Sequence, residues 1–178
     1  MEAEQAFTKA YEEHADALFR HCVFRVSSRE RALELTQETF MKTWDAVAKG
    51  QDVRNYRAFL FRVLNNLIID EYRKEKSLSL DALLEKEGVS EGSFEDLQTG
   101  SLEELFEKFE IRIQSEQLSE ALGTLPESYK TVIVMRFINE LRPKEIAEIL
   151  QESENAVSVR INRGLKKLHE CMSENNTL

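Results

Sequence analysis

The sequence predicts an all-α fold, built from two small helical domains joined by an acidic linker. Three observations lead to this prediction. The 178 residues include only 6 glycines and 2 prolines, which are the residues that most often interrupt helices. Apolar residues recur at helical spacing through residues 1–76 and again through residues 116–178. Between them, residues 77–100 are rich in serine and acidic residues and hold three of the glycines.

Residues 1–76 are expected to form three helices. The first shows a helical apolar pattern made by Phe7, Tyr11, Leu18, Phe19, Cys22 and Val26. Ser27 or Ser28 is expected to cap the second helix, which ends near Gly50. Asn55 then caps a third helix that runs to about Lys76.

The linker spans residues 77–115 and concentrates the acidity of the chain. The whole sequence has a net charge of -9, and residues 76–115 hold ten acidic and four basic residues. Within the linker, Ser101 and Glu104 have the spacing of a capping box, which predicts that a helix begins there.

Residues 116–178 are expected to be helical throughout. Pro126 suits the first turn of a helix, and residues 127–140 are predicted as a buried helix, although their Thr-Val-Ile-Val run also suits a strand. Pro143 opens a short helix, and Ser153 caps the last one. Three residues separate these two helices, which is the spacing of a helix-turn-helix.

The last helix has an apolar stripe and a basic face. The stripe consists of Val157, Ile161, Leu165 and Leu168. Between Asn155 and Leu168 there are four basic residues and no acidic one. Any single basic residue could simply belong to a solvated helix face. Here, however, the basic face coincides with the turn of the helix-turn-helix and with the N-terminal cap of the last helix. We therefore expect DNA contacts from Asn155, Ser158, Val159, Arg160, Asn162, Arg163 and Lys166.

No enzyme motif is found, and no cofactor or catalytic residue is predicted. The P-loop, GxSxG and HExxH patterns are absent from the sequence. The His21-Cys22 pair and the His169-x-Cys171 pair lack the usual spacing of zinc ligands, so no metal is predicted and both thiols are expected to be structural. Neither a signal peptide nor an apolar run long enough for a bilayer is visible, which favours the cytoplasm.

The stretch ALELTQETFMKTWDA, residues 32–46, carries the first part of a family resemblance. It resembles the polymerase-binding segment of the extracytoplasmic-function (group IV) sigma factors of bacterial RNA polymerase, which belong to the sigma-70 family. Glu34 stands where aspartate is usual. The resemblance implies that polymerase is contacted by Glu34, Gln37, Glu38 and Phe40, and exposed polar groups beside an apolar stripe suit a polar-rimmed interface.

Two further blocks extend the resemblance over nearly the whole chain. Residues 55–76 are similar to the segment that melts and recognises the -10 element, although Asn65 replaces an arginine. The DNA-binding residues implied there are Arg54, Tyr56, Arg57, Arg62 and Asn66. The pattern from Leu122 to Leu168 is similar to the family's -35-binding domain, with Arg142 at a position where serine or threonine is usual. Gly164 stands where alanine is common and should cost the helix up to ~1 kcal/mol.

The resemblance implies domains and partners. Residues 1–76 would be sigma-2, residues 77–115 the linker and residues 116–178 sigma-4. The expected partners are core RNA polymerase, promoter DNA and an anti-sigma factor, with no membrane insertion and no need for a homo-oligomer. The linker either threads through the polymerase as a mimic of nucleic acid or serves as a solvated tether.

Two other functions fit parts of the pattern. A stand-alone helix-turn-helix regulator would need a dimerisation heptad or a ligand pocket, and neither is clear in the sequence. A decoy that occupies polymerase without reading DNA would be favoured by loss of the basic face on the last helix, and that face is intact.

Overall fold

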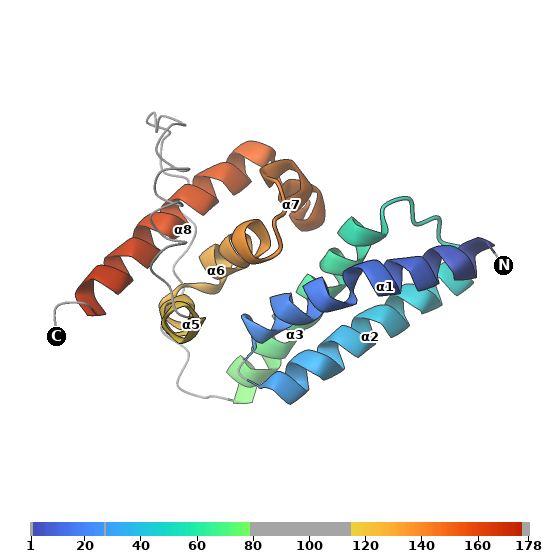
Figure 1. Cartoon of the computed structure of the whole chain (residues 1–178), viewed down its shortest axis with the longest axis horizontal. Coiled ribbons are helices and arrows are strands. Elements are labelled where there is room, and N and C mark those ends of the chain that lie inside the picture. The colour runs from blue at the N-terminus through green and yellow to red at the C-terminus, as the bar shows by residue number, and fades with distance from the viewer. Residues whose placement is uncertain (1, 27, 79–114, 176–178) are drawn as a thin grey trace.

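The computed structural model describes residues 2–26, 28–78 and 115–175, and every element in these ranges is helical. This confirms the all-α prediction. The first half consists of α1 (Glu2–Val23), α2 (Arg29–Ala48) and α3 (Tyr56–Leu78), which pack against one another as a three-helix unit (Figure 1). The helix predicted from Ser101 lies outside the described residues.

Local sequence signals fix the ends of the first three helices. The backbone N–H of Arg31 donates to the hydroxyl of Ser28, which is the N-cap of α2. Gly50 follows the end of that helix with φ of 89°, a left-handed conformation that glycine adopts without strain. The N–H of Ala58 donates to Asn55 Oδ1 at the start of α3. Each cap therefore lies where the sequence predicts it.

Three threonines of α2 lie inside the first core among apolar side chains. Thr36, Thr39 and Thr43 are buried, and each hydroxyl donates to the carbonyl four residues earlier in the same helix, at 2.7 to 2.8 Å. Because each hydroxyl is satisfied within its own helix, α2 places polar side chains in the core without unpaired groups. The fully buried apolar residues of this core include Leu18, Cys22, Leu60, Phe61, Leu64 and Ile68.

The second half contains α5 (Ser115–Thr124), α6 (Glu127–Ile133), a π-helical turn η1 (Val134–Ile138), α7 (Pro143–Leu150) and α8 (Glu154–Asn175). The segment 127–140, whose apolar run also suited a strand, is helical as predicted from residue 127 to residue 138, two residues short of the predicted end. Its final turn widens into the π form, and Glu140 then takes a φ of 55°. This widened turn and the left-handed residue after it end the helix and present Asn139 to the other half of the molecule.

A glycine allows α6 and α8 to approach closely. A Cβ atom at Gly164 would lie 3.1 Å from Ile133 Cγ1 and 3.3 Å from Tyr129 Cβ. Such a separation is tighter than ordinary van der Waals contact. Glycine lowers the helix propensity at position 164, but the absence of a side chain there permits the close packing of α6 and α8 in the second core.

The two halves pack directly on one another, with α7 against α3 and η1 against α1. Polar groups are buried at this junction. His21 is fully buried, and its Nδ1 lies 2.8 Å from Oδ1 of Asn139, while Arg25 Nη1 lies 3.5 Å from its Nε2. Burial, and to a smaller extent the charge of Arg25, lowers the pKa of His21 to about 3. The ring is therefore neutral, with the proton on Nδ1.

Replacing Gly164 by valine is expected to destabilise the protein by roughly 2 kcal/mol, because the larger side chain overlaps Ile133 and Tyr129. Urea unfolding would measure the change. Gly123→Ala is the matched control: nothing lies within 4 Å of a Cβ there, so helix propensity alone should leave stability unchanged or raise it by up to ~1 kcal/mol. Equal losses in both variants would contradict close packing at position 164.

Acid should destabilise the protein in part through His21. Its pKa is 6.5 when unfolded and about 3 when folded, so the unfolded chain binds more protons between these values and stability falls as pH decreases. The loss from this residue should be roughly 2 kcal/mol at pH 5. Denaturant titrations at pH 7 and pH 5 would show a smaller loss for His21→Gln than for the unmodified protein. Equal losses of stability in His21→Gln and in the unmodified protein would refute the assignment of this pH dependence to His21.

Candidate nucleic-acid interface

The helix-turn-helix is formed by α7, the turn at residues 151–153 and α8. Gln151 ends α7 with a φ of 59°, and Ser153 caps α8 by accepting a hydrogen bond from the N–H of Ala156 at 3.1 Å. At the start of α7, the N–H of Arg142 donates to Glu145 Oε2 at 2.8 Å. The Glu145 carboxylate thus binds the backbone N–H of the N-cap residue, which is one half of a capping box, and this bond lowers the pKa of Glu145.

The two faces of α8 separate as the sequence predicts. The apolar stripe of Val157, Ile161, Leu165 and Leu168 is buried. On the other side, Asn155, Arg163 and Lys166 are exposed. The remaining predicted contacts, Ser158, Val159, Arg160 and Asn162, are half-buried. An approaching duplex therefore reaches Asn155, Arg163 and Lys166 most readily. Asn155 is the first residue of the predicted set, and Arg163 and Lys166 are the last two.

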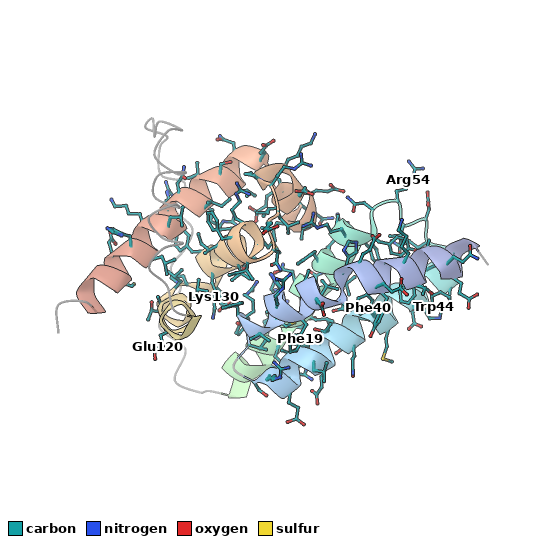
Figure 2. All side chains as sticks on the ribbon, viewed as in Figure 1. Phe19, Phe40, Trp44, Arg54, Glu120 and Lys130 are labelled. Carbon is teal, nitrogen blue, oxygen red and sulfur yellow. The ribbon has the colours of Figure 1, made fainter. Side chains whose placement is uncertain are left out.

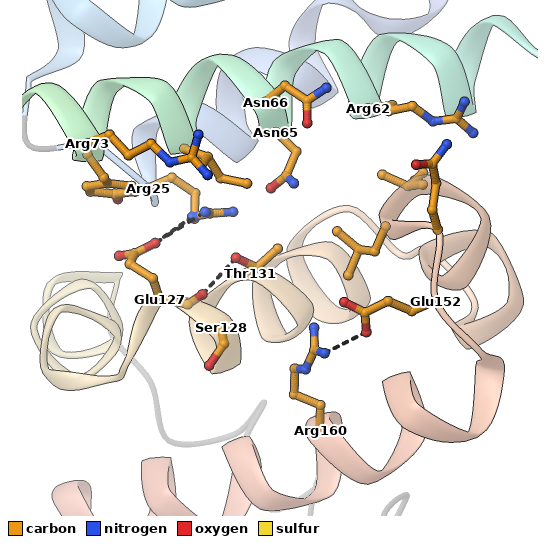
Figure 3. A pocket seen from close by; sticks show the side chains of 15 residues that line it. Arg25, Arg62, Asn65, Asn66, Arg73, Glu127, Ser128, Thr131, Glu152 and Arg160 are labelled. Carbon is orange, nitrogen blue, oxygen red and sulfur yellow. Dashed lines mark hydrogen bonds and ion pairs between the residues drawn. The ribbon is translucent and has the colours of Figure 1, made fainter. Parts of the chain in front are cut away.

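Arg160 faces the first half of the molecule instead of open solvent. Its Nη2 donates to Glu152 Oε2 at 2.5 Å, across the turn of the helix-turn-helix. Both side chains line a crevice of about 440 Å³ that lies between α3 on one side and α6, α7 and α8 on the other (Figure 3). Arg62 and Asn66 of α3 line the same crevice, so residues predicted to read two different DNA elements lie around one cavity.

The residues predicted to contact the -10 element fall into separate environments. Arg54 projects from the loop before α3, away from the crevice, and forms an exposed ion pair with Asp52 (Figure 2). Tyr56 is half-buried against the core. Arg57 and Arg62 are half-buried and donate hydrogen bonds to the second half, at the carbonyls of residues 139 and 148. The structure therefore brings Arg62 and Asn66 together and leaves Arg54 outside the cavity.

The predicted polymerase-binding face of α2 has a different composition from the one expected. Glu34 and Gln37 are exposed and Glu38 is half-buried. Phe40 is 6% exposed, because its ring packs against the rings of Phe7 and Tyr11, with centroids 6.2 and 4.7 Å away. The prediction of Phe40 as a surface contact was therefore wrong.

Phe40 is buried, but other apolar residues of α2 are exposed. Met41, Leu33 and Trp44 are 68%, 50% and 39% exposed, and Trp44 contacts Phe7 at the edge of the aromatic cluster (Figure 2). Trp44 carries part of the motif, but sequence analysis did not assign it to the interface. Large apolar side chains on an exposed helix face are a recognisable signal for a docking surface.

Glu34 has an ion-pair partner within the chain. Arg31 donates to Glu34 through Nη1 at 2.6 Å, and through Nε and Nη2 to both carboxylate oxygens of Glu71 at 2.6 and 2.7 Å. The hydrogen bonds from Arg31 lower the pKa of Glu71. Arg31 thus ties α2 to α3 and keeps the Glu34 carboxylate oriented along the exposed face.

Two further kinds of reactive group are the cysteine in the first core and the side chains that can ligate metals. Cys22 is a free thiol whose pKa burial raises to about 11, so it stays protonated at neutral pH. Among the described residues, no three His, Cys, Asp or Glu side chains are grouped so that they could hold a metal ion. A search of the helices in the same residues finds none that is both long enough and apolar enough to span a bilayer.

Comparison with known proteins extends the resemblance to both halves. Sigma-70 region 2 matches residues 10–78 and sigma-70 region 4 matches residues 115–168. The RNA polymerase sigma factor SigV of Bacillus subtilis is 29% identical over 154 residues, covering 86% of this chain and 83% of its own. The ECF RNA polymerase sigma factor SigW of the same organism is 29% identical over 174 residues, covering 96% and 91%.

Solved structures share the fold. The sigma factor RpoE of Bartonella quintana, in complex with the anti-sigma factor NepR, superposes with a TM-score of 0.70 at 19% identity, covering 95% of this chain and 98% of that one. CnrH, in complex with the cytosolic domain of CnrY, gives a TM-score of 0.67 at 23% identity, covering 96% and 90%.

A helix-turn-helix with a basic outer face, preceded by a three-helix unit that matches sigma-70 region 2, defines a promoter-recognition factor of the sigma-70 type. The matches to both regions in this order cover most of the chain. The chain belongs to the extracytoplasmic-function sigma factors.

The buried position of Phe40 generates a prediction that separates packing from surface contact. Phe40→Ala should destabilise the protein by roughly 3–5 kcal/mol, because it leaves a cavity beneath Phe7 and Tyr11. Gln37→Ala, an exposed position on the same helix, should change stability by less than about 0.5 kcal/mol. Chemical denaturation of both variants would measure the difference, and a small effect at Phe40 would contradict its burial.

Proposed function

We propose that this sigma factor divides its task between two domains. Residues 1–76 form sigma-2, residues 116–178 form sigma-4, and residues 77–115 link them. As a sigma factor, the chain binds bacterial core RNA polymerase and directs promoter-specific initiation through the -10 and -35 elements. The polymerase supplies the chemistry of RNA synthesis. No second copy of the chain is needed.

The basic outer face of α8 is the observation that carries this proposal. Sigma-4 inserts this helix into the major groove of the -35 element, where Asn155 and Arg163 contact bases and Lys166 contacts a phosphate. The exposure of these three side chains supports the assignment. Ser158, Val159, Arg160 and Asn162 complete the reading face once sigma-4 is on DNA.

Sigma-2 performs the other two tasks on separate surfaces. The exposed side of α2 docks on polymerase through Glu34, Gln37 and Glu38, together with exposed Trp44 and Met41. The start of α3 and the loop before it hold unpaired DNA of the -10 element. Arg54, Tyr56, Arg57, Arg62 and Asn66 supply the cationic and stacking groups that such binding requires.

Each domain alone presents a small DNA-binding surface, so the two act together. Polymerase holds both domains on one particle, which raises the effective concentration of the second contact once the first has formed. The net charge of -9 weakens binding of the free chain to DNA. An anti-sigma factor is a further proposed partner, since RpoE of Bartonella quintana was crystallised with one. The proposed site of action is the cytoplasm.

Transcription with purified core polymerase and a pool of random promoters would test the function. Initiation should depend on the chain, and Arg163→Ala should lower it between about 5-fold and 150-fold, the loss of one base contact. Lys166→Ala should weaken binding to all promoters alike. It should also reduce the slope of log affinity against log salt concentration by about one. Lys9→Ala is the matched control, because Lys9 is an exposed lysine of α1, remote from the helix-turn-helix.

Two outcomes would replace this function by another. Competition with a second sigma factor for core polymerase, without initiation, would identify a decoy. Specific binding of duplex DNA by the chain alone, with no effect on polymerase, would identify a stand-alone regulator.

A further inference from the structure

A crevice remains where the two halves pack together, and the proposed function gives it no task. In this closed arrangement the crevice lies between α3 on one side and α6, α7 and α8 on the other, and it measures about 440 Å³ (Figure 3). Pockets that bind small molecules measure roughly 300–1,000 Å³. The crevice therefore has the size of a small-molecule site.

The lining of the crevice is basic, although the whole chain has a net charge of -9. It includes four arginines and two carboxylates, namely Arg25, Arg62, Arg73, Arg160, Glu127 and Glu152. Glu127 is paired with Arg25, and Glu152 with Arg160. Arg73 is exposed and lies 3.7 Å from Asp70, outside the lining. Arg62 therefore carries a charge that no carboxylate of the lining balances.

Arg62 also has a hydrogen-bond donor that is not used. Its Nη2 donates to a neutral acceptor, the carbonyl of Glu148, at 3.1 Å. Its Nε is buried and has no hydrogen-bond partner among the described residues. A guanidinium is a planar fork of donors that matches the oxygen atoms of a phosphate or a carboxylate. The position of Arg62 thus suits an anion that enters the crevice.

Asn65 contributes a second polar group without a partner. It is 6% exposed, it points from α3 toward Thr131 of α6 (Figure 3), and its Oδ1 is buried without a hydrogen-bond partner in the described ranges. Thr131 does not supply one, because its hydroxyl donates to the carbonyl of Glu127 at 2.7 Å. The amide of Asn65 is therefore available to whatever fills the crevice.

Unpaired buried groups are concentrated at this one place. Of four such side-chain atoms among the described residues, three line the crevice: Arg62 Nε, Asn65 Oδ1 and Tyr72 Oη, which lies beside the Arg25–Glu127 pair without a hydrogen bond of normal geometry. A buried unpaired group costs about 1–3 kcal/mol, so native proteins pair such groups with protein, water or ligand. Water can pair all three groups, but an anionic ligand would also neutralise Arg62.

An apolar surface completes the lining. Ile69 of α3 and Ile149 and Leu150 of α7 line the crevice together with Tyr72. In small-molecule sites, apolar and aromatic side chains hold the ring or hydrocarbon part of the ligand, and a few polar groups fix its orientation. The lining therefore fits a ligand that combines an anionic group with a ring.

We propose that the crevice binds a small phosphate ester with a ring-bearing part, of the chemical class of the nucleoside monophosphates. A phosphate suits it better than a carboxylate because arginines line both walls, Arg62 on α3 and Arg160 on α8, and a phosphate offers three oxygen atoms instead of two. Asn65 and Tyr72 bind polar groups of the ring-bearing part. This site goes beyond the proposed function and does not depend on it.

Isothermal titration calorimetry on the full chain, with the four ribonucleoside monophosphates as probes, would test the site. At least one should bind saturably, as one molecule per chain, and should raise the midpoint of thermal unfolding. The nucleoside of the same base and inorganic phosphate should each bind roughly ten-fold more weakly or less, because each lacks one of the two parts that the lining accommodates.

Two substitutions locate the binding in the crevice. Arg62→Gln should weaken it roughly ten-fold or more, through loss of a charged hydrogen bond, and Asn65→Leu should weaken it about two- to ten-fold, through loss of a neutral one. Arg20→Gln is the matched control for Arg62→Gln, since Arg20 is an exposed arginine of α1 that does not line the crevice. Its affinity should equal that of the unmodified chain. Circular dichroism would verify folding, and if Asn65→Leu does not fold, Arg62→Gln decides.

Several results would overturn the proposal. Absence of saturable binding below about 1 mM for all four probes would leave water as the occupant of the crevice. Nucleoside or inorganic phosphate binding as tightly as the monophosphate would refute the ligand class, and equal losses in Arg62→Gln and Arg20→Gln would reflect net charge alone. A thymidine decanucleotide that displaces the monophosphate at a lower nucleotide concentration would assign the same groups to DNA.

The transcription assay tests the proposed function separately. A chain that initiates with core polymerase but binds none of the monophosphates would refute the site and leave the sigma function standing.

Discussion

The burial of Arg25 is the constraint on which the arrangement of the two halves depends. A charged group that is 2% exposed needs an acceptor, and Glu127 supplies it from the first turn of α6, where a carboxylate is also favoured by the helix dipole. With α6 held there, η1 runs along α1 and delivers Asn139 to His21, and α7 comes to lie on α3. This ion pair is thus one of the contacts that set where the helix-turn-helix lies, together with the hydrogen bonds of Asn139 and Arg57.

Sequence analysis predicted the elements because their determinants are local. Ser28, Asn55 and Ser153 lie at helix starts and their hydroxyl or amide oxygens accept backbone hydrogen bonds there, as expected for caps. Phe40 was misplaced because an aromatic residue at helical spacing fits a core as well as an interface, and only the neighbouring rings of α1 decide between them. The contacts of Arg57 and Arg62 were missed because their acceptors are backbone carbonyls more than 80 residues away.

The closed arrangement also accounts for a departure from the family pattern. Asn65 occupies a position where an arginine is usual in the resembling sigma factors, and it is 6% exposed on the wall of the crevice. An arginine there would add another guanidinium beside Arg25 and Arg62, with the cost of a buried unpaired charge. Asparagine leaves only a neutral amide with one unsatisfied oxygen. The residue at position 65 thus fits its environment beside the opposite half of the molecule.

Gly164 has a consequence for the way promoters are distinguished. Each residue turns a helix by roughly 100°, so the azimuth of α8 about its own axis decides which side chains face the groove. The close approach to Ile133 and Tyr129 fixes that azimuth from the inside of the domain. Consider two relatives with identical base-contacting residues but different residues where α8 meets Ile133 and Tyr129. They would present the base-contacting residues to DNA at different angles. Under the proposed function, promoter preference would then depend partly on the core residues at this contact, although they touch no DNA.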